Sequence, residues 1–298
     1  MRFYTNIVQW GNSLLVREVE NGERKNYRVK YSPTLYARVN KETAYKTLNG
    51  DYVTPIKHPT IKDAKEWVDN YKNQKNLIFG NTQYPYSYLN ETYKDPCPWD
   101  KDQLLIVTVD IEVQCENGFP HARLAEEELL SITIKNQQSK KIVVWGIGEF
   151  KNDREDVTYV NCDNEVHLLK EFIVFWEKHY PDIVTGWNTE FFDIPYICNR
   201  IKNLFGEDEL KRLSPWNSVQ EREVYQLGRK TQTYNIQGVS GLDYLDLYRK
   251  FTYGVKERYT LDHIATIELG ERKDGNPFDT FREWYTKDYQ SFIEYNIQ

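Results

Sequence analysis

The stretch LLIVTVDIEV, residues 104–113, is the longest strand-like run in this sequence. Its apolar residues continue without the alternation of a half-exposed strand, which predicts a central strand buried on both faces. Side chains alternate along a strand, so Asp110 and Glu112 point to the same face near its end. Two neighbouring acids lose hydration and repel each other unless a cation lies between them. The natural partner is a hard divalent cation, although an isolated Asp-x-Glu pair also fits a strand that has simply reached solvent.

Length and composition allow two domains and a sizeable core, because the chain has 298 residues. The 40% of hydrophobic and 28% of charged residues are typical of a soluble globular protein. The net charge of −6 argues against binding duplex DNA mainly by bulk attraction, but it allows a local basic groove. The 15% of aromatic residues suits core edges, and it also suits surfaces on which bases stack.

Cysteine usage and hydropathy limit the environment of the chain. The four cysteines are widely spaced without a Cys-x-x-Cys pair, which suggests neither a zinc site nor a disulfide scaffold and fits a reducing compartment. No apolar segment of a signal peptide follows Met1, and no stretch is long enough to span a bilayer. We therefore expect no membrane partner.

Residues 1–100 are predicted to form a small α+β domain. Strand-like runs separated by turn residues fill the first 57 positions. Thr60, with Asp63 three residues later, resembles a capping box, and the following apolar residues have helical spacing. Residues 81–99 are rich in Tyr, Asn and Pro and are interpreted as connecting structure, so a domain boundary is placed near residue 100.

Residues 101–298 are predicted to form an α/β domain with a mixed sheet. Two further strands, 129–135 and 141–145, follow the central strand as an antiparallel meander. A helix capped by Asp163 then runs to His179, with Val166, Leu169, Ile173 and Trp176 on its buried face. A short strand at 183–185 leads directly into another helix. The change from a meander to alternating strands and helices predicts helices on the faces of a mixed sheet.

Asp193 lies where the short strand gives way to its helix. This position is the carboxyl edge of the sheet, where ligands gather in open α/β folds, although an ordinary helix cap is the alternative. Further along, residues 223–237 predict a hairpin turning at 227–230. Asp243 and Asp246 follow in an apolar-rich segment. They could be ligands, but the interpretation as caps or surface residues is favoured. Two helices, 259–269 and 278–298, complete the predicted elements.

The three acids Asp110, Glu112 and Asp193 would suit two divalent ions. Two such ions clamp the attacking and leaving oxygens of an in-line phosphoryl displacement and lower the pKa of bound water. A site made only of carboxylates favours Mg²⁺ or Mn²⁺ over zinc. Paired carboxylates also serve glycosidases, but the order of elements does not favour their usual large barrel.

Several runs of the sequence resemble a known protein family. The run TGWNTEFFDIPY, residues 185–196, continuing through 199–202 and 212–215, closely resembles the second exonuclease motif of family-B DNA polymerases, above all those of T-even-type bacteriophages. Asp110-Ile111-Glu112 resembles the first exonuclease motif. The runs 31–36 and 242–248 match the same phage group, so the resemblance covers nearly the whole chain.

The resemblance implies a ribonuclease H-like exonuclease fold from about residue 100 and 3′→5′ proofreading removal of mispaired nucleotides from single-stranded primer ends. Asp110 and Glu112 would bind the ion that activates water, and Asp193 would help to hold the second ion. Asn188 and Phe119 would contact the primer end, the aromatic ring by stacking, and Phe192 is a further candidate for substrate binding. The hairpin around Gly228 would help to separate primer from template, and RNA is a further candidate ligand of the N-terminal domain.

The sequence departs from the family pattern at its end. The third exonuclease motif has a catalytic Tyr followed four residues later by a metal-binding Asp, on one helix face. Tyr295 supplies the Tyr, but the sequence stops at Gln298, before that Asp. The expectation is a two-metal site that is incomplete here and weak or absent nuclease activity.

The palm, fingers and thumb of a polymerase are also missing from these 298 residues. The expected partners are therefore single-stranded DNA and a polymerase part on the same chain or on a second subunit, in the cytoplasm of an infected bacterial host. Two function hypotheses remain. The first is the proofreading exonuclease region of a replicative DNA polymerase. The second is a non-catalytic nucleic-acid-binding or assembly piece of a split polymerase.

Overall fold

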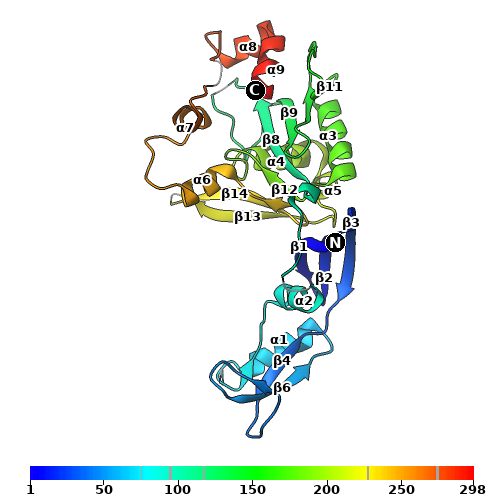
Figure 1. The fold of residues 1–298 in the computed structure, drawn as a ribbon. Coiled ribbons are helices and arrows are strands. Elements are labelled where there is room, and N and C mark those ends of the chain that lie inside the picture. Colours follow the sequence, from blue (N-terminus) through cyan, green and yellow to red (C-terminus); the bar gives the residue numbers. More distant parts are fainter. Residues whose placement is uncertain (75, 94–95, 117, 227, 273–274) are drawn as a thin grey trace. The chain divides into compact units, whose positions relative to one another are not determined.

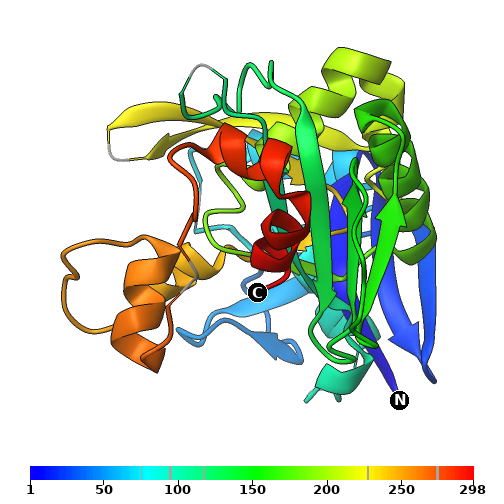
Figure 2. The ribbon, with the colours of Figure 1, turned by 90° about the horizontal axis from the view of Figure 1, so that it is seen from above.

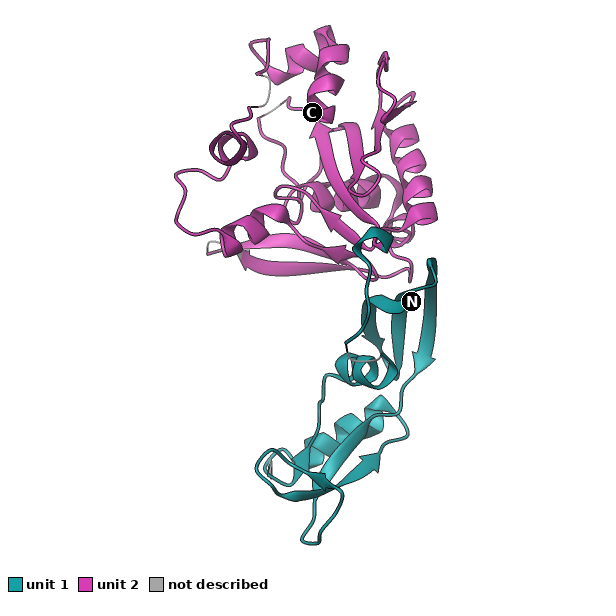
Figure 3. Ribbon diagram, in the orientation of Figure 1, with its two compact units in different colours: residues 1–103 teal, residues 104–298 magenta. Residues whose placement is uncertain are grey.

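The computed structural model describes residues 1–74, 76–93, 96–116, 118–226, 228–272 and 275–298 (Figure 1). The chain forms two compact units, residues 1–103 and 104–298, which Figure 3 colours separately. In the described ranges, no helix has both the length and the apolar character needed to cross a membrane.

The first unit contains two antiparallel sheets. One has the order β1-β2-β3, with strands β1 (Arg2–Trp10), β2 (Ser13–Glu20) and β3 (Glu23–Lys30). The other has the order β5-β6-β4-β7, with strands β4 (Thr34–Arg38), β5 (Tyr45–Lys46), β6 (Tyr52–Lys57) and β7 (Ile78–Phe79). Gly11 turns between β1 and β2 with a φ of +58°, a conformation that costs glycine little.

Helix α1 (Ile61–Asn70) begins as the sequence predicts. The Thr60 hydroxyl accepts a hydrogen bond from the Asp63 backbone N–H, and Ile61 and Ala64 are buried. The interpretation of residues 81–99 as connecting structure is wrong, because α2 (Tyr84–Thr92) forms there. Pro85 lies in the first turn of α2, where a missing N–H costs nothing, and Tyr84 anchors the helix in the core. A short 3₁₀ turn, η1 (Lys101–Gln103), ends this unit.

The second unit is built on a six-stranded mixed sheet with the order β11-β10-β9-β8-β12-β15. Strand β8 runs antiparallel to β9, and β9 runs antiparallel to β10, which is the predicted meander. Parallel pairs join β8 to β12, β12 to β15 and β10 to β11. The strands are β8 (Ile106–Val113), β9 (Leu129–Asn136), β10 (Ile142–Gly146), β11 (Val157–Asn161), β12 (Ile183–Thr185) and β15 (Ser240–Gly241).

The two faces of β8 differ, which corrects the prediction of a strand buried equally on both. Its odd-numbered side chains are buried in the main core, whereas the even-numbered ones are only half-buried. Helices α3 (Glu165–His179) and α4 (Asp193–Phe205) supply that core. On the even-numbered face, α9 (Tyr289–Ile297) packs against β8 and β9 (Figure 2). The acids therefore lie between a sheet and a helix.

Three helix predictions need correction. Asn164, rather than Asp163, caps α3 by accepting a hydrogen bond from the His167 N–H, and Val166 is exposed instead of lying on the buried face. The single helix predicted at 278–298 is two helices, α8 (Phe281–Lys287) and α9. Asp288 separates them, because its carboxylate accepts from the Ser291 N–H and starts a new helix.

The remaining elements of the second unit lie outside the six-stranded sheet. They are α5 (Glu207–Lys211), the hairpin strands β13 (Val219–Gln226) and β14 (Arg229–Ile236), α6 (Tyr244–Phe251) and α7 (Leu261–Leu269). The hairpin begins earlier than predicted. Leu227, in its predicted turn, lies outside the described residues.

Replacing Phe172 by Ala should destabilise the second unit by about 3–5 kcal/mol, because a cavity would open in a closely packed core. Phe172 is 1% exposed and contacts Trp145 and Trp176. Urea denaturation followed by circular dichroism measures the change. Val174→Ala, on the exposed side of the same helix, is the matched control and should have little effect. Equal losses in the two variants would contradict this description of the core.

Candidate active site

Asp110 and Glu112 form a carboxylate pair on one face of β8. Directly opposite on β9 stand Thr133, which pairs with Asp110, and Ser131, which pairs with Glu112. Both acids are half-buried, whereas Ser131 and Thr133 are buried. This polar group lies under α9, in a sheet whose other face is apolar. Such a group needs polar partners from the helix that covers it.

Asn296 of α9 supplies these partners. Its Nδ2 donates to Asp110 Oδ2 at 3.3 Å and to Glu112 Oε1 at 3.4 Å. Its Oδ1 accepts from the Thr133 hydroxyl and lies 3.5 Å from the Ser131 hydroxyl. The sequence prediction did not assign Asn296 to the site. The available signal was an amide among the apolar residues on the buried face of the last helix.

Asp193 approaches the same strand from its side. It is the first residue of α4 and is 4% exposed, and its Oδ1 accepts the Ile111 backbone N–H at 3.2 Å. Burial raises the pKa of Asp193 well above its ordinary value, and the charges of Asp110 and, to a smaller extent, Glu112 raise it further. The structure thus brings the three predicted acids into electrostatic contact along one strand.

The carboxylates are arranged as a pair and a separate third group. Within the described ranges, no three His, Cys, Asp or Glu side chains converge on one point as a ready cage for a metal. Mg²⁺ usually keeps several waters and needs only one or two protein carboxylates. The Asp110–Glu112 pair therefore fits one hard cation. Burial and then the charge of Asp110 raise the pKa of Asp193, and a second cation would relieve this repulsion between the acids.

A tight loop connects β12 to Asp193. Gly186 is required at its start, since a Cβ there would lie 1.9 Å from the Thr189 Oγ1 and 2.8 Å from the Val109 carbonyl oxygen. Asn188 adopts a φ of +65°. The buried Asp243 carboxylate accepts the backbone N–H of Asn188 at 3.1 Å and that of Glu190 at 2.9 Å. Asp243 also caps α6, as predicted, so one carboxylate fixes both segments.

Two aromatic rings lie beside the acids. Phe119 is 84% exposed, and its ring centroid is 5.1 Å from that of Phe192, the residue before Asp193. Phe192 rests in turn on Tyr196 at 5.8 Å. An exposed ring supported by a half-buried ring suits stacking on a nucleobase. We call Phe119 and Phe192 the aromatic ledge.

The other two predicted residues lie elsewhere. Gly228 is exposed at the tip of the β13–β14 hairpin, with a φ of +78°. Tyr295 precedes Asn296 on α9, and its ring contacts Trp284 at a centroid distance of 4.7 Å. Adjacent residues project about 100° apart on a helix, so Tyr295 points away from the direction taken by Asn296.

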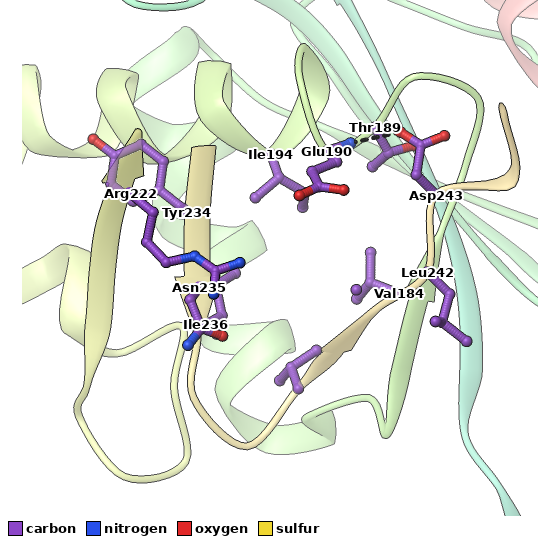
Figure 4. A pocket seen from close by; sticks show the side chains of 12 residues that line it. Val184, Thr189, Glu190, Ile194, Arg222, Tyr234, Asn235, Ile236, Leu242 and Asp243 are labelled. Carbon is purple, nitrogen blue, oxygen red and sulfur yellow. Dashed lines mark hydrogen bonds between the residues drawn. The ribbon is translucent and has the colours of Figure 1, made fainter. Parts of the chain in front are cut away.

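A cavity of about 150 Å³ separates the loop from the base of the hairpin (Figure 4). Glu190, Asp243 and Arg222 contribute its charged lining, and apolar side chains such as Val184 and Ile236 form much of the rest. Burial, followed by the charge of Asp243, raises the pKa of Glu190. The Thr233 hydroxyl of β14 donates to the Glu190 carbonyl at 2.9 Å. The hairpin base therefore holds the same loop that carries Asp193.

The family described as "DNA polymerase family B, exonuclease domain" matches residues 59–264. The chain belongs to DNA polymerase family B. This membership confirms the predicted ribonuclease H-like class of the mixed α/β unit and the predicted relation to proofreading replicative polymerases. Exonuclease domains of family B use divalent metal ions, in agreement with the chemistry of the carboxylate pair.

Similar proteins include the DNA-directed DNA polymerases of Escherichia phage RB69 and Enterobacteria phage T4. Their sequences are 31% and 32% identical to this chain, in each case over 99% of its length. The chain spans 36% of the length of each. A more distant family B relative is the DNA polymerase catalytic subunit of Alcelaphine herpesvirus 1. It is 27% identical over 59% of this chain and 18% of its own length.

Asp193→Asn tests the electrostatic contact between the acids. A raised folded-state pKa means that the folded protein binds the proton of Asp193 more tightly than the unfolded chain does. The associated stability is therefore present below the ordinary carboxyl pKa and is lost as pH rises through the raised pKa. In a buffer with a metal chelator, the variant should gain about 1 kcal/mol at neutral pH and lose this gain in acid, measured by urea denaturation.

Asp208→Asn is the control. Asp208 is an exposed acid of α5, and its hydrogen bond with Lys211 lowers its pKa below the ordinary value. Its amide variant should therefore show no gain in stability at neutral pH. A pH-independent effect of Asp193→Asn would rule out the electrostatic contact.

Proposed function

We propose that this chain is the 3′→5′ exonuclease region of a replicative DNA polymerase, the region that removes nucleotides from single-stranded primer ends with two divalent cations, Mg²⁺ or Mn²⁺. The observation that supports this most directly is the Asp110–Glu112 pair on β8 with the buried Asp193 of α4 bonded to the same strand, within a family B exonuclease domain. The reaction is hydrolysis of a phosphodiester, in which water attacks phosphorus and the 3′ oxygen leaves.

Asp110 and Glu112 would hold the cation next to the attacking water, and Asp193 would hold the second. When bound, such cations make water a stronger acid and stabilise charge on the attacking and leaving oxygens. Ile111 orients Asp193 through its backbone N–H, because that bond occupies one carboxylate oxygen. Tyr295 would complete the catalytic group, a role that rests on the family resemblance.

The substrate strand would lie against the aromatic ledge. Phe119 and Phe192 would stack on bases near the 3′ end, and Asn188 would contact the primer end from the tight loop. The hairpin with Gly228 at its tip would help to part primer from template. These roles would account for the exposed ring of Phe119 next to the carboxylates. A site that bound only water and cations would have no need of an exposed apolar surface.

The chain would work together with the polymerase region that its phage relatives possess, on the same chain or on a second subunit, in the cytoplasm of an infected bacterial host. Binding of RNA by residues 1–100 stays a prediction. The alternative is a non-catalytic nucleic-acid-binding or assembly piece, in which the acids would be idle.

Replacing both Asp110 and Glu112 by Ala should lower cleavage by about a thousandfold, because loss of a bound cation removes several kcal/mol of transition-state stabilisation. The measurement is release of nucleotides from single-stranded DNA labelled at its 3′ end, with Mg²⁺ or Mn²⁺ and with a chelator. Asp208→Ala, which removes an exposed acid on α5, is the control. Cleavage that survives the double substitution would reject the proposal. Binding of DNA without cleavage by any of these proteins would favour the alternative.

Phe119→Ala should raise the KM for single-stranded DNA by about tenfold with a smaller change in kcat, because one stacked base loses its platform. The side chain is exposed, so folding should be unaffected. Steady-state kinetics on an oligonucleotide measure both constants. Tyr86→Ala, which removes another exposed aromatic ring in the first unit, is the control. An unchanged KM would exclude the ledge from substrate binding.

A further inference from the structure

The amide of Asn296 contacts both carboxylates of the acid pair at once. Asn296 is 6% exposed, and its Nδ2 lies 3.3 Å from Asp110 Oδ2 and 3.4 Å from Glu112 Oε1. These distances are long for hydrogen bonds, as expected when one NH₂ group spans two acceptors. Of the oxygens on each acid, the amide therefore contacts one.

The orientation of this amide is determined from its other side. The hydroxyls of Ser131 and Thr133 can each donate a hydrogen bond, and both lie at Asn296 Oδ1. Ionised carboxylates only accept, so the NH₂ group must face Asp110 and Glu112. In this orientation, both hydroxyls donate to the amide oxygen, and the amide NH₂ group donates to both carboxylates. A flipped amide would place its oxygen against two negative charges.

We propose that Asn296 is a positioning residue for cation binding, which holds one oxygen of each carboxylate and so orients the pair before a cation arrives. This inference rests on the proposed function, because it assumes that Asp110 and Glu112 bind a cation. The donated N–H groups offset part of the repulsion between the two acids.

A purely structural role makes a different prediction. The neighbours of Asn296 on α9, Phe292, Ile293 and Ile297, are buried in an apolar cluster that anchors the helix. Loss of a buried amide alone would lower the stability of the protein without changing its affinity for a cation. Loss of a positioning group would lower that affinity, and outer partners of metal ligands are typically worth about 10–100-fold in metal affinity.

The experiment is titration of the full chain with Mn²⁺, followed by the electron paramagnetic resonance signal of free Mn²⁺. The parent protein is compared with Asn296→Ala and with Thr133→Val, which keeps the amide but removes a hydroxyl that orients it. Asn199→Ala is the matched control, because Asn199 is also a buried amide and bonds to Tyr234 and Gln232 rather than to the acids.

We expect Mn²⁺ to bind about tenfold more weakly to Asn296→Ala. Thr133→Val should cause a smaller loss, and Asn199→Ala should lower the melting temperature without changing the Kd. An unchanged or tighter Kd in Asn296→Ala would overturn the inference while leaving the metal site intact. If Asn296→Ala does not fold, the Kd of Thr133→Val decides in the same way. Failure of the parent to bind Mn²⁺ would instead overturn both the metal-dependent function and this inference.

Discussion

The site depends on the point at which β12 stops pairing with β8. The two strands are paired only from Ile106 to Thr108 on β8, since β12 has three residues. Beyond that point the backbone N–H of Ile111 needs another acceptor, because a buried donor without one is costly. The Asp193 carboxylate provides it. The same break in the sheet therefore directs an acid toward the strand that carries Asp110 and Glu112.

The accumulation of negative charge follows from this geometry. Burial raises the pKa of Asp193, and the charges of Asp110 and Glu112 raise it further. N–H donors from Ile111 and Asn296 offset only part of the repulsion among these acids. The remaining repulsion is what gives such a site its affinity for hard cations. The same repulsion lowers the stability of the metal-free chain and raises its affinity for a cation, a trade-off that is common at functional sites.

The loop at 186–192 links this charge to the surface where a strand of DNA would lie. Gly186 allows a close turn against β8, and Asp243 holds the loop from the start of α6. Thr233 of the hairpin donates a hydrogen bond to the loop at Glu190. At the end of the loop, the ring of Phe192 packs against that of Phe119. Displacement of the hairpin base would therefore shift the loop that leads to Asp193, because hydrogen bonds and packing connect the two.

Local pattern alone determined much of this protein: the strand with its two acids on one face, the meander, the Thr60 cap and the helix that starts at Asp193. Alternation and helical spacing encode such features within a few residues. The same patterns missed α2, where tertiary burial of Tyr84 stabilises a helix in a Tyr- and Pro-rich segment, and the break at Asp288. Only the tertiary structure decided that Asn296 meets Asp110. The two residues lie 186 positions apart, and they meet because α9 packs on β8 and β9. The spacing of residues within a short segment cannot predict such a contact.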